Sequence, residues 1–295
     1  MQTPKRQEIP GLTLVGTPIG NLGDISPRVV EAFQQADTIA CEDTRVTQKL
    51  LNHLEIQKPL VRLDEEILEK KLPSILKALE QGQAIVFCTD AGMPGVSDPG
   101  ARLVVEVVKA QIPIQVIPGP SALTAAWSLS GFQTDQVRFC GFFPRKTALK
   151  KSALDEVRSH PKVAFFWFES PKRIRQTLDF CESEIDFSFS IFAVKELTKK
   201  FEEKWHGESS LFFENIKQYL NSEGERGEWV IGLMNHDSSA DQGYRKEDWA
   251  NALKCLRDCG VSRKESVLSV SQNFGVSKNQ IYDASLEIFS KKRRS

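Results

Sequence analysis

A group of charged side chains follows one of the short apolar segments of the sequence. The segment Thr38–Cys41 is typical of a strand, and Glu42-Asp43-Thr44-Arg45 comes directly after it. Two carboxylates beside a guanidinium at the end of a strand can move a proton or orient a polar substrate. We therefore interpret this group as catalytic or substrate-orienting. The alternative is structural, with Asp43 as a helix cap and Arg45 in solvent.

A second charged group stands later in the chain. The segment Lys195-Glu196-Leu197-Thr198-Lys199-Lys200 follows the apolar run Ser188–Val194 and supplies another pair of opposite charges. Composition alone favours a solvated turn for this group.

Three loops rich in glycine and proline could line a binding pocket. They are Gly16–Gly23, Thr89–Gly100 and Pro118–Ala122, and each follows an expected strand. Glycine lets backbone amides approach a polar or anionic ligand closely. Because the carboxyl ends of parallel strands share one edge of a sheet, we expect the loops to meet there. The first loop matches neither the dinucleotide-binding nor the P-loop pattern, and alone it fits a structural turn equally well.

Two aspartates of the second loop have different expected roles. Asp90 stands at the end of a strand, where its carboxylate suits a ribose hydroxyl or an ammonium group. Asp98 precedes Pro99, a pair that is typical of a helix start, so we expect Asp98 to cap the following helix.

These loops need a scaffold of alternating strands and helices. From Leu12 to Ile117, short apolar runs alternate with segments that carry apolar residues at helical spacing. This pattern is typical of βαβ units, so the first domain is expected to be α/β with a parallel sheet. Ser26-Pro27 is expected to start the first helix. The expected strands are Leu12–Val15, Thr38–Cys41, Leu60–Leu63, Ala84–Cys88 and Ile114–Ile117.

A second α/β domain with a mixed sheet is expected downstream, followed by a helical tail. We expect the domains at residues 11–121 and 122–236, and the tail at 245–290. In the tail, Ser262–Glu265 and Ser277–Gln280 match the capping box, and with Gly275 between them they resemble a helix-turn-helix unit. The expected strands are Phe139–Phe143, Val163–Phe168, Ser188–Val194, a segment around Trp205, and Trp229–Leu233; the expected helices are Ser152–Val157, Arg173–Phe180 and Leu211–Leu220.

Composition excludes several classes of protein. The 39 Lys and Arg residues balance 39 Asp and Glu residues, so any nucleic-acid site must be a local patch. The six cysteines include no C-x-x-C pair and the four histidines have no metal-ligand spacing, so we predict no metal. No segment has the length of a signal peptide or a membrane span, so we expect a cytoplasmic protein without a membrane partner.

Eight segments follow one another in a characteristic order: Val15–Asp24, Cys41–Arg45, Asp90–Pro94, Ser97–Gly100, Pro118–Ala122, Gly141–Pro144, Glu169–Arg173 and Lys195–Lys199. Together they resemble the bacterial small-subunit ribosomal RNA cytidine 2′-O-methyltransferases, which belong to the tetrapyrrole methylase superfamily. The likeness runs from about Leu12 to Met234, and eight ordered motifs are more specific than any single one.

The resemblance implies a two-domain tetrapyrrole-methylase-like fold, S-adenosylmethionine as cofactor, and usually a homodimer. It also implies methyl transfer to the ribose of a cytidine in the decoding region of ribosomal RNA, either as RNA or as an assembled small subunit. Carried over by position, the cofactor contacts would come from Pro18, Asp90, Ala91, Gly92, Val96, Ser121, Ala122, Phe168 and Val230.

For this reaction the protein must mainly align the 2′-oxygen, the methyl group and the sulfur. A ribose hydroxyl is a weak nucleophile, so a nearby base would help. We take Asp43 and Glu196 as candidate bases, and Arg45 and Lys195 as candidates for holding a phosphate or lowering a pKa. The expected RNA-binding residues are Arg145, Lys146, Lys172, Arg173 and Lys199, although each alone fits ordinary solvated surface.

Two departures from the family pattern bear on these expectations. Met93 stands where the family usually has threonine, and this change affects one expected hydrogen bond to the cofactor. Leu63–Glu66 replaces a segment that is usually rich in histidine and asparagine, and this change affects the expected RNA contacts near the third strand. Two other functions stay open: a tetrapyrrole methyltransferase of the same superfamily, and a non-catalytic RNA-binding assembly factor. The first loop, which lacks the Gly-x-Gly-Pro-Gly form, and the helical tail argue against the tetrapyrrole enzyme.

Overall fold

The chain consists of alternating strands and helices followed by a helical C-terminal segment. The computed structural model describes residues 11–96, 98–236, 246–274 and 278–290. The chain divides into two compact units, each with most of its contacts inside itself. The first unit contains the described residues up to Leu129 together with Val194–Glu203 and Glu228–Val230, and the second unit contains the others.

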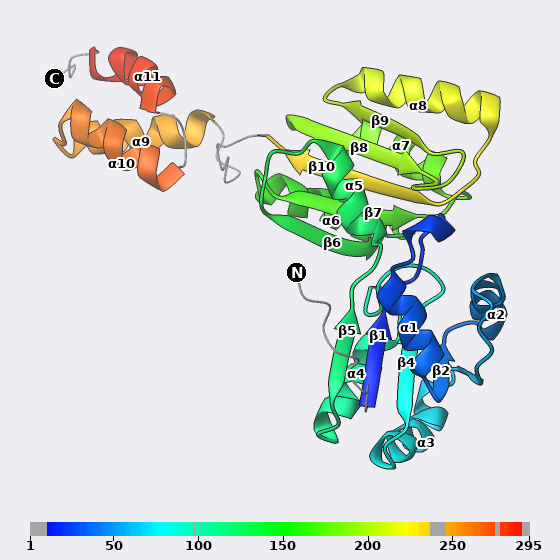
Figure 1. Ribbon diagram of the computed structural model, residues 1–295. Coiled ribbons are helices and arrows are strands. Elements are labelled where there is room, and N and C mark those ends of the chain that lie inside the picture. Colours follow the sequence, from blue (N-terminus) through cyan, green and yellow to red (C-terminus); the bar gives the residue numbers. More distant parts are fainter. Residues whose placement is uncertain (1–10, 97, 237–245, 275–277, 291–295) are drawn as a thin grey trace, which may run out of the picture. The chain divides into compact units, whose positions relative to one another are not determined.

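A five-stranded sheet is the framework of the first unit (Figure 1). Its order is β3-β2-β4-β1-β5, and all neighbouring strands run parallel. Each of the predicted strands is present, with ends within one residue of those expected. The elements are β1 (Gly11–Val15), α1 (Pro27–Gln35), β2 (Thr38–Cys41), α2 (Thr44–His53), β3 (Leu60–Arg62), α3 (Leu68–Glu80), β4 (Ala84–Cys88), α4 (Gly100–Lys109), β5 (Ile114–Ile117) and α5 (Ala122–Ser130), with a 3₁₀ turn at Leu22–Asp24.

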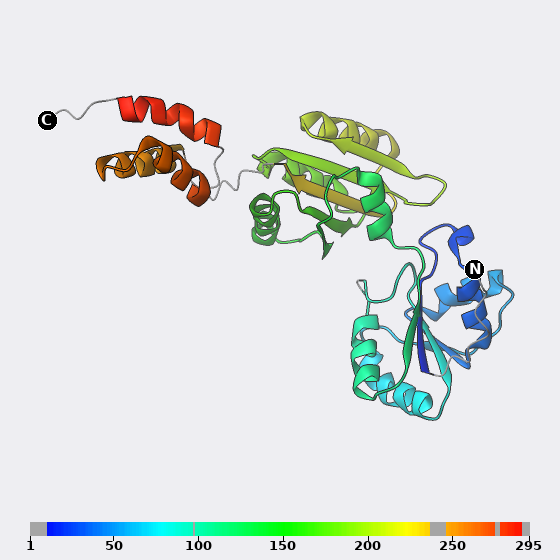
Figure 2. The ribbon, with the colours of Figure 1, turned by 60° about the vertical axis from the view of Figure 1, so that its left-hand side comes forward.

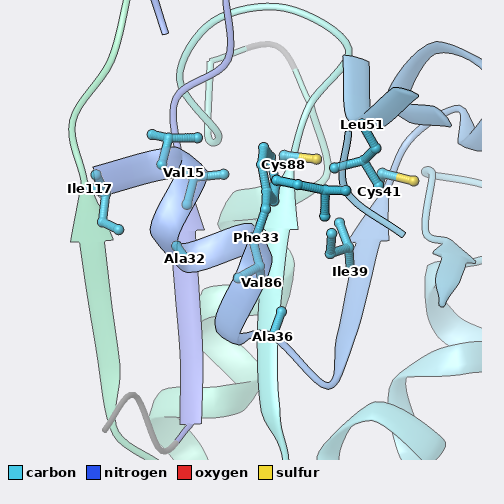
Figure 3. Close-up of a cluster of buried hydrophobic side chains, with 12 residues drawn as sticks. Val15, Ala32, Phe33, Ala36, Ile39, Cys41, Leu51, Val86, Cys88 and Ile117 are labelled. Carbon is cyan, nitrogen blue, oxygen red and sulfur yellow. The ribbon is translucent and has the colours of Figure 1, made fainter. Parts of the chain in front are cut away.

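Alternate side chains of these strands face two helical layers. Val86 and Cys88 pack with α1 and α2 around Phe33, which is fully buried (Figure 3). Ile85 and Phe87 point to the other face and pack with α3 and α4. Side chains alternate along a strand with a period of two, so a strand with both faces covered is apolar throughout. This is why apolar runs marked the strands correctly.

The start of α1 confirms the predicted cap. Val29 N donates to Ser26 Oγ at 3.3 Å, and Pro27 occupies the first helical turn. The missing N–H of proline costs nothing at that position, because the first amides of a helix have no partner within it.

The second sheet is mixed and has the order β6-β7-β10-β8-β9. All predicted strands and helices of this part are present. The elements are β6 (Val137–Phe142), α6 (Thr147–Ser159), β7 (Ala164–Glu169), α7 (Ile174–Glu184), β8 (Phe189–Lys195), β9 (Glu203–Gly207), α8 (Ser210–Glu223) and β10 (Trp229–Asn235). The helices are longer than expected: α6 begins five residues earlier, and α7 and α8 continue through polar residues at their C-terminal ends, which carry no apolar periodicity.

Three C-terminal helices, α9 (Lys246–Asp258), α10 (Arg263–Phe274) and α11 (Lys278–Ser290), pack side by side (Figure 1, Figure 2). Their shared core contains Trp249, Leu253, Val267, Val270 and Ile281.

The predicted cap of α10 is present, since Glu265 N donates to Ser262 Oγ at 3.3 Å. Ser277 and Gly275 lie outside the described residues. In the part of the chain that the structure describes, no helix is long and apolar enough to cross a membrane.

Candidate functional site

The three glycine-rich loops are in direct contact at the carboxyl edge of the first sheet. Thr17 N donates to Gly92 O at 2.9 Å, and Gly92 N donates to Thr17 O at 3.1 Å. The first and third loops touch through their backbones: a Cβ atom on Gly119 would lie 2.5 Å from the carbonyl oxygen of Gly16. The predicted meeting of the loops is therefore confirmed, and at Gly16 and Gly119 glycine is required by space.

Met93 lies at the junction of these loops. Gly119 N is 3.2 Å from Met93 Sδ, and a Cβ atom on Gly16 would lie 2.6 Å from the same sulfur. A long, flexible thioether fills irregular space well. At this position, the departure from threonine places an apolar side chain between the first and third loops.

The loop after β4 is organised by Asp98. Its carboxylate accepts hydrogen bonds from the backbone of Gly95 (2.8 Å), Val96 (2.9 Å) and Gly100 (2.7 Å). Gly100 is the first residue of α4 and Pro99 is its N-cap, so Asp98 binds a free amide at the helix start from one residue before the cap position. Gly95 has a φ of 92°, a conformation that glycine adopts without strain.

Asp43 and Arg45 form a closed pair at the end of β2. Asp43 is the N-cap of α2 and accepts a hydrogen bond from Arg45 N at 2.8 Å. The Arg45 side chain also donates to the Asp43 carboxylate, at 2.5 Å and 3.0 Å. Hydrogen bonds from Arg45 lower the pKa of Asp43 to about 2. The capping role is therefore present, but Arg45, although exposed, is paired.

A cavity of about 500 Å³ opens beside this pair. Asp43 N donates to Asp90 Oδ1 at 3.1 Å, which joins the ends of β2 and β4 at the cavity wall. The Glu42 carboxylate also faces the cavity, and its pKa is raised to about 7, first by burial and then by repulsion from Asp90, Asp98 and Asp64. The cavity is lined by Glu42, Asp43, Thr44, Arg45, Arg62, Asp64 and Asp90.

Asp64 and Arg62 reach the cavity from β3. Cys41 pairs with Arg62 in the register of β2 and β3, so both strands end at the same level. Arg62 forms an ion pair with Asp64, whose carboxylate also accepts a hydrogen bond from Ile67 N at 3.0 Å. Asp64, which departs from the family pattern, therefore starts the turn before α3 and adds negative charge to the cavity.

The second charged group is held in place, not solvated. Lys195 ends β8 and is only 7% exposed, so the expected solvated turn is wrong for this residue. Glu196 accepts hydrogen bonds from Lys199 Nζ and from Glu228 N, both at 2.9 Å. Burial opposes ionisation of Glu196, but these hydrogen bonds outweigh it and lower its pKa.

Similarity to known proteins accords with this loop arrangement. The profile for tetrapyrrole (corrin/porphyrin) methylases matches residues 11–210. The chain belongs to this methylase family. It is 32% identical to ribosomal RNA small subunit methyltransferase I of Synechocystis sp., covering 94% of this chain and 98% of that protein. The protein of the same name from Thermotoga maritima is 40% identical, covering 68% of this chain and 88% of that protein.

The fold agrees with solved structures of this methylase family. A diphthine synthase structure aligns with a TM-score of 0.56 and 16% sequence identity, covering 76% of this chain and 89% of that chain. The uroporphyrin-III-C-methyltransferase of Thermus thermophilus aligns with a TM-score of 0.51 and 12% identity, covering 76% of this chain and 93% of the other. At such low sequence identity, the structural similarity shows a shared fold and nothing about function.

The chain's own residues fit the cofactor of a methylase. S-adenosylmethionine carries a sulfonium and an ammonium group, and the exposed carboxylate of Asp90 stands beside the acidic cavity that would favour such cations. Because Gly16 and Gly119 carry no side chain, the backbones of the first and third loops can meet beside the loop that carries Asp90. Seven of the predicted cofactor residues lie on the three joined loops: Pro18, Asp90, Ala91, Gly92, Val96, Ser121 and Ala122.

The other two predicted cofactor residues lie on strands of the second sheet. Phe168, on β7, is half-buried against Phe139, with ring centroids 4.7 Å apart. Val230, on β10, is 5% exposed.

The predicted RNA-binding residues differ in their availability. Arg145, Lys146 and Lys172 are exposed and have no ion pair among the described residues. Arg173, in contrast, pairs with the buried Glu169 at 2.6 Å and donates to the carbonyl oxygen of Phe143 at 3.0 Å. Lys199 is half-buried and is bound by Glu196 and Glu228.

Reasoning from the sequence did not identify Arg62 and Asp64 as cavity residues. It also treated Glu42 and Asp43 as one charged group, although their pKa values shift in opposite directions. The signal for Arg62 was present, because it stands at the end of an expected strand on the same sheet edge. The sequence marked Asp43 as a possible helix cap, but only the fold shows that Asp43 also meets the Arg45 guanidinium and that Glu42 does not.

Proposed function

We propose that the chain transfers the methyl group of S-adenosylmethionine to the 2′-oxygen of a cytidine ribose in the decoding region of small-subunit ribosomal RNA. The observation that carries the proposal is the near full-length match to a ribosomal RNA small subunit methyltransferase I. The loop arrangement supports it, because the residues that fit the cofactor lie next to a cavity that fits a charged, hydroxyl-bearing substrate.

The methyl donor is already activated, because S-adenosylmethionine carries its methyl group on a sulfonium. The protein must then hold cofactor and ribose in line. In this proposal the Asp90 carboxylate accepts a hydrogen bond from a cofactor hydroxyl or ammonium group. The backbone of the loops after β1, β4 and β5 would hold the rest of the cofactor, and Phe168 and Val230 are proposed as further contact residues.

The substrate is held by charge at the edge of the sheet and by exposed basic side chains. Arg45 and Lys195 are the groups proposed to hold phosphate or polar substrate atoms. Asp43 binds the Arg45 guanidinium, and Glu196 binds Lys199 Nζ. Both carboxylates have a lowered pKa, which makes each a weak base. Arg145, Lys146, Lys172, Arg173 and Lys199 are the proposed RNA contacts.

We propose further that the enzyme acts in the cytoplasm as a homodimer on RNA or on the assembled subunit. Its domains are proposed at residues 11–121 and 122–236, with the helical tail at 245–290. The shared apolar core of α9, α10 and α11 supports a tail that packs on itself.

Nucleoside mass spectrometry of small-subunit ribosomal RNA tests the function. Deletion of the gene is expected to remove the 2′-O-methyl mark from one cytidine, and re-expression is expected to restore it. An unchanged mark would reject the proposal. Calorimetry with S-adenosylmethionine addresses the alternative of a non-catalytic assembly factor, which would not bind the cofactor, and assays with a tetrapyrrole acceptor address the small-molecule enzyme.

A further inference from the structure

The carboxylate of Glu42 differs from every other acidic side chain of the cavity. Asp43 is bound by Arg45, Asp64 by Arg62, and Asp90 by the backbone amide of Asp43. Glu42 has neither a hydrogen bond nor an ion pair among the described residues, although it is half-buried and lines the cavity. A polar group in such a place is normally satisfied. Glu42 is therefore the acidic side chain of this wall whose carboxylate has both oxygens available.

The charges around Glu42 raise the affinity of its carboxylate for a proton. Repulsion comes from Asp90 at the end of β4, from Asp98 before α4 and from Asp64 after β3, and burial acts in the same direction as the largest cause. The guanidinium groups of Arg45 and Arg62 also line the cavity, but each is paired with its own aspartate. The pKa of Glu42 is therefore raised to about 7.

A base is most effective in catalysis when its pKa lies near the working pH. Asp43, with a pKa of about 2, is always ionised near neutral pH but has little affinity for a proton. Glu196 is bound by two hydrogen bonds that favour its charged form. Asp90 also lines the cavity and its pKa is raised, first by burial, but one of its oxygens already accepts a hydrogen bond from Asp43 N. Of the four carboxylates, only Glu42 combines a position on the cavity wall, a raised pKa and a carboxylate without a hydrogen bond among the described residues.

On the basis of the proposed function, we propose that Glu42 is the general base that accepts the proton of the ribose 2′-hydroxyl. In this step the 2′-oxygen forms a bond to the methyl carbon while the bond from that carbon to sulfur breaks. The electron pair of the broken bond stays on sulfur, which becomes a neutral thioether. The hydroxyl proton moves to a carboxylate oxygen of Glu42, and solvent later removes it through the open cavity.

The test is single-turnover methylation of purified small subunits that lack the mark, with cofactor in excess. Wild-type protein is expected to show a rate that rises with pH and levels off above about pH 7, as the ionisation of one carboxylate requires. Glu42→Gln removes the base at nearly constant size and is expected to lower the rate by a factor of about 10² to 10⁴. Its rate is expected to lose the dependence on this ionisation.

Three controls separate chemistry from structure. Glu31→Gln, an exposed carboxylate on α1, is expected to keep the wild-type rate and pH profile. Glu42→Asp keeps a carboxylate and is expected to retain more activity than Glu42→Gln. Calorimetry with S-adenosylmethionine is expected to give an affinity for Glu42→Gln within a few-fold of wild type, because Asp90 is the carboxylate proposed to bind the cofactor and it is unchanged in this variant.

The inference is overturned if Glu42→Gln, with cofactor affinity intact, methylates within about threefold of the wild-type rate. A wild-type rate that does not change between about pH 5.5 and pH 8.5 overturns it as well, even if the variant does not fold. Failure of the proposed function looks different, since wild-type protein itself would then form no 2′-O-methylcytidine in the subunit at any pH.

Discussion

Glu42 and Asp43 are neighbours in the chain, yet their acidities differ because their surroundings differ. Asp43 starts a helix and meets a guanidinium, and both interactions favour its charged form. Glu42 faces a wall of carboxylates without a hydrogen-bond donor of its own, so its neutral form is favoured. An ionised Glu42 therefore costs folding free energy, which gives a prediction independent of any substrate.

The first prediction concerns the stability of Glu42→Gln. The pKa of Glu42 is about 7 in the folded protein against a normal value of 4.5. Wild-type stability must then fall as the pH rises through this range, because the folded state holds the proton that the unfolded state has released. The whole difference corresponds to about 3 kcal/mol, and solvent screening of a half-buried carboxylate reduces the expected cost to about 1 kcal/mol.

Glu42→Gln is therefore expected to be more stable than wild-type protein at about pH 8, by about 2 °C in melting temperature. At about pH 5 the two proteins are expected to unfold alike. Thermal unfolding followed by circular dichroism measures both values, with Glu31→Gln as the matched control. Equal melting temperatures at pH 8 would show that Glu42 ionises without cost, as an ordinary surface carboxylate does.

At the scale of residues, the sequence predicted which side chains stand at the sheet edge but not how they pair. Alternation of strands and helices placed Asp43 and Asp90 on one edge, and their hydrogen bond confirms this. The position of Asp64 on the cavity wall could not be predicted, because it depends on the strand register that places Arg62 beside Cys41. The buried position of Lys195 was missed for a related reason: a charged residue is normally exposed, and only the fold shows otherwise.

At the scale of elements, the loops after β1, β4 and β5 behave as one structure. The backbone bridge between Thr17 and Gly92 and the contact between Gly16 and Gly119 join the three loops directly. The parallel-sheet rule predicted that the loops would meet. It could not predict that Met93 would pack into the junction, because side-chain packing depends on coordinates that a motif does not contain.

Gly119→Ala tests this joint structure. The new Cβ atom would lie 2.5 Å from the carbonyl oxygen of Gly16, a backbone atom that cannot move alone, so the first and third loops must separate. We expect a loss of about 1–3 kcal/mol in stability, as for other overpacked sites. We also expect at least a tenfold weaker affinity for S-adenosylmethionine in isothermal titration calorimetry.

Gly82→Ala is the control for Gly119→Ala. Gly82 has a φ of 84° and nothing near its missing Cβ atom, so this substitution introduces backbone strain without a clash. It is expected to destabilise the protein slightly and to leave cofactor affinity unchanged. Equal cofactor affinity in both variants would mean that contact between the loops is not needed for binding.

At the scale of the whole molecule, the balance of charge limits how RNA can be bound. With 39 basic and 39 acidic side chains, no overall field attracts a polyanion. Phosphates must therefore meet local groups, and a basic side chain without a carboxylate partner gives up no ion pair when it binds one. Arg145 and Lys146, which precede α6, satisfy this condition, whereas Arg173 and Lys199 are bound by carboxylates.

The double substitution of Arg145 and Lys146 by alanine is expected to weaken binding of the small subunit or its RNA without changing cofactor affinity. Each phosphate contact that is lost should reduce the slope of log affinity against log salt by about 1, so a slope smaller by up to about 2 is expected. Filter binding at several salt concentrations measures it. Alanine at the exposed Lys70 and Lys77 of α3 removes the same charge elsewhere and is expected to leave the slope unchanged. If both pairs changed the slope equally, net charge rather than a local patch would govern recognition.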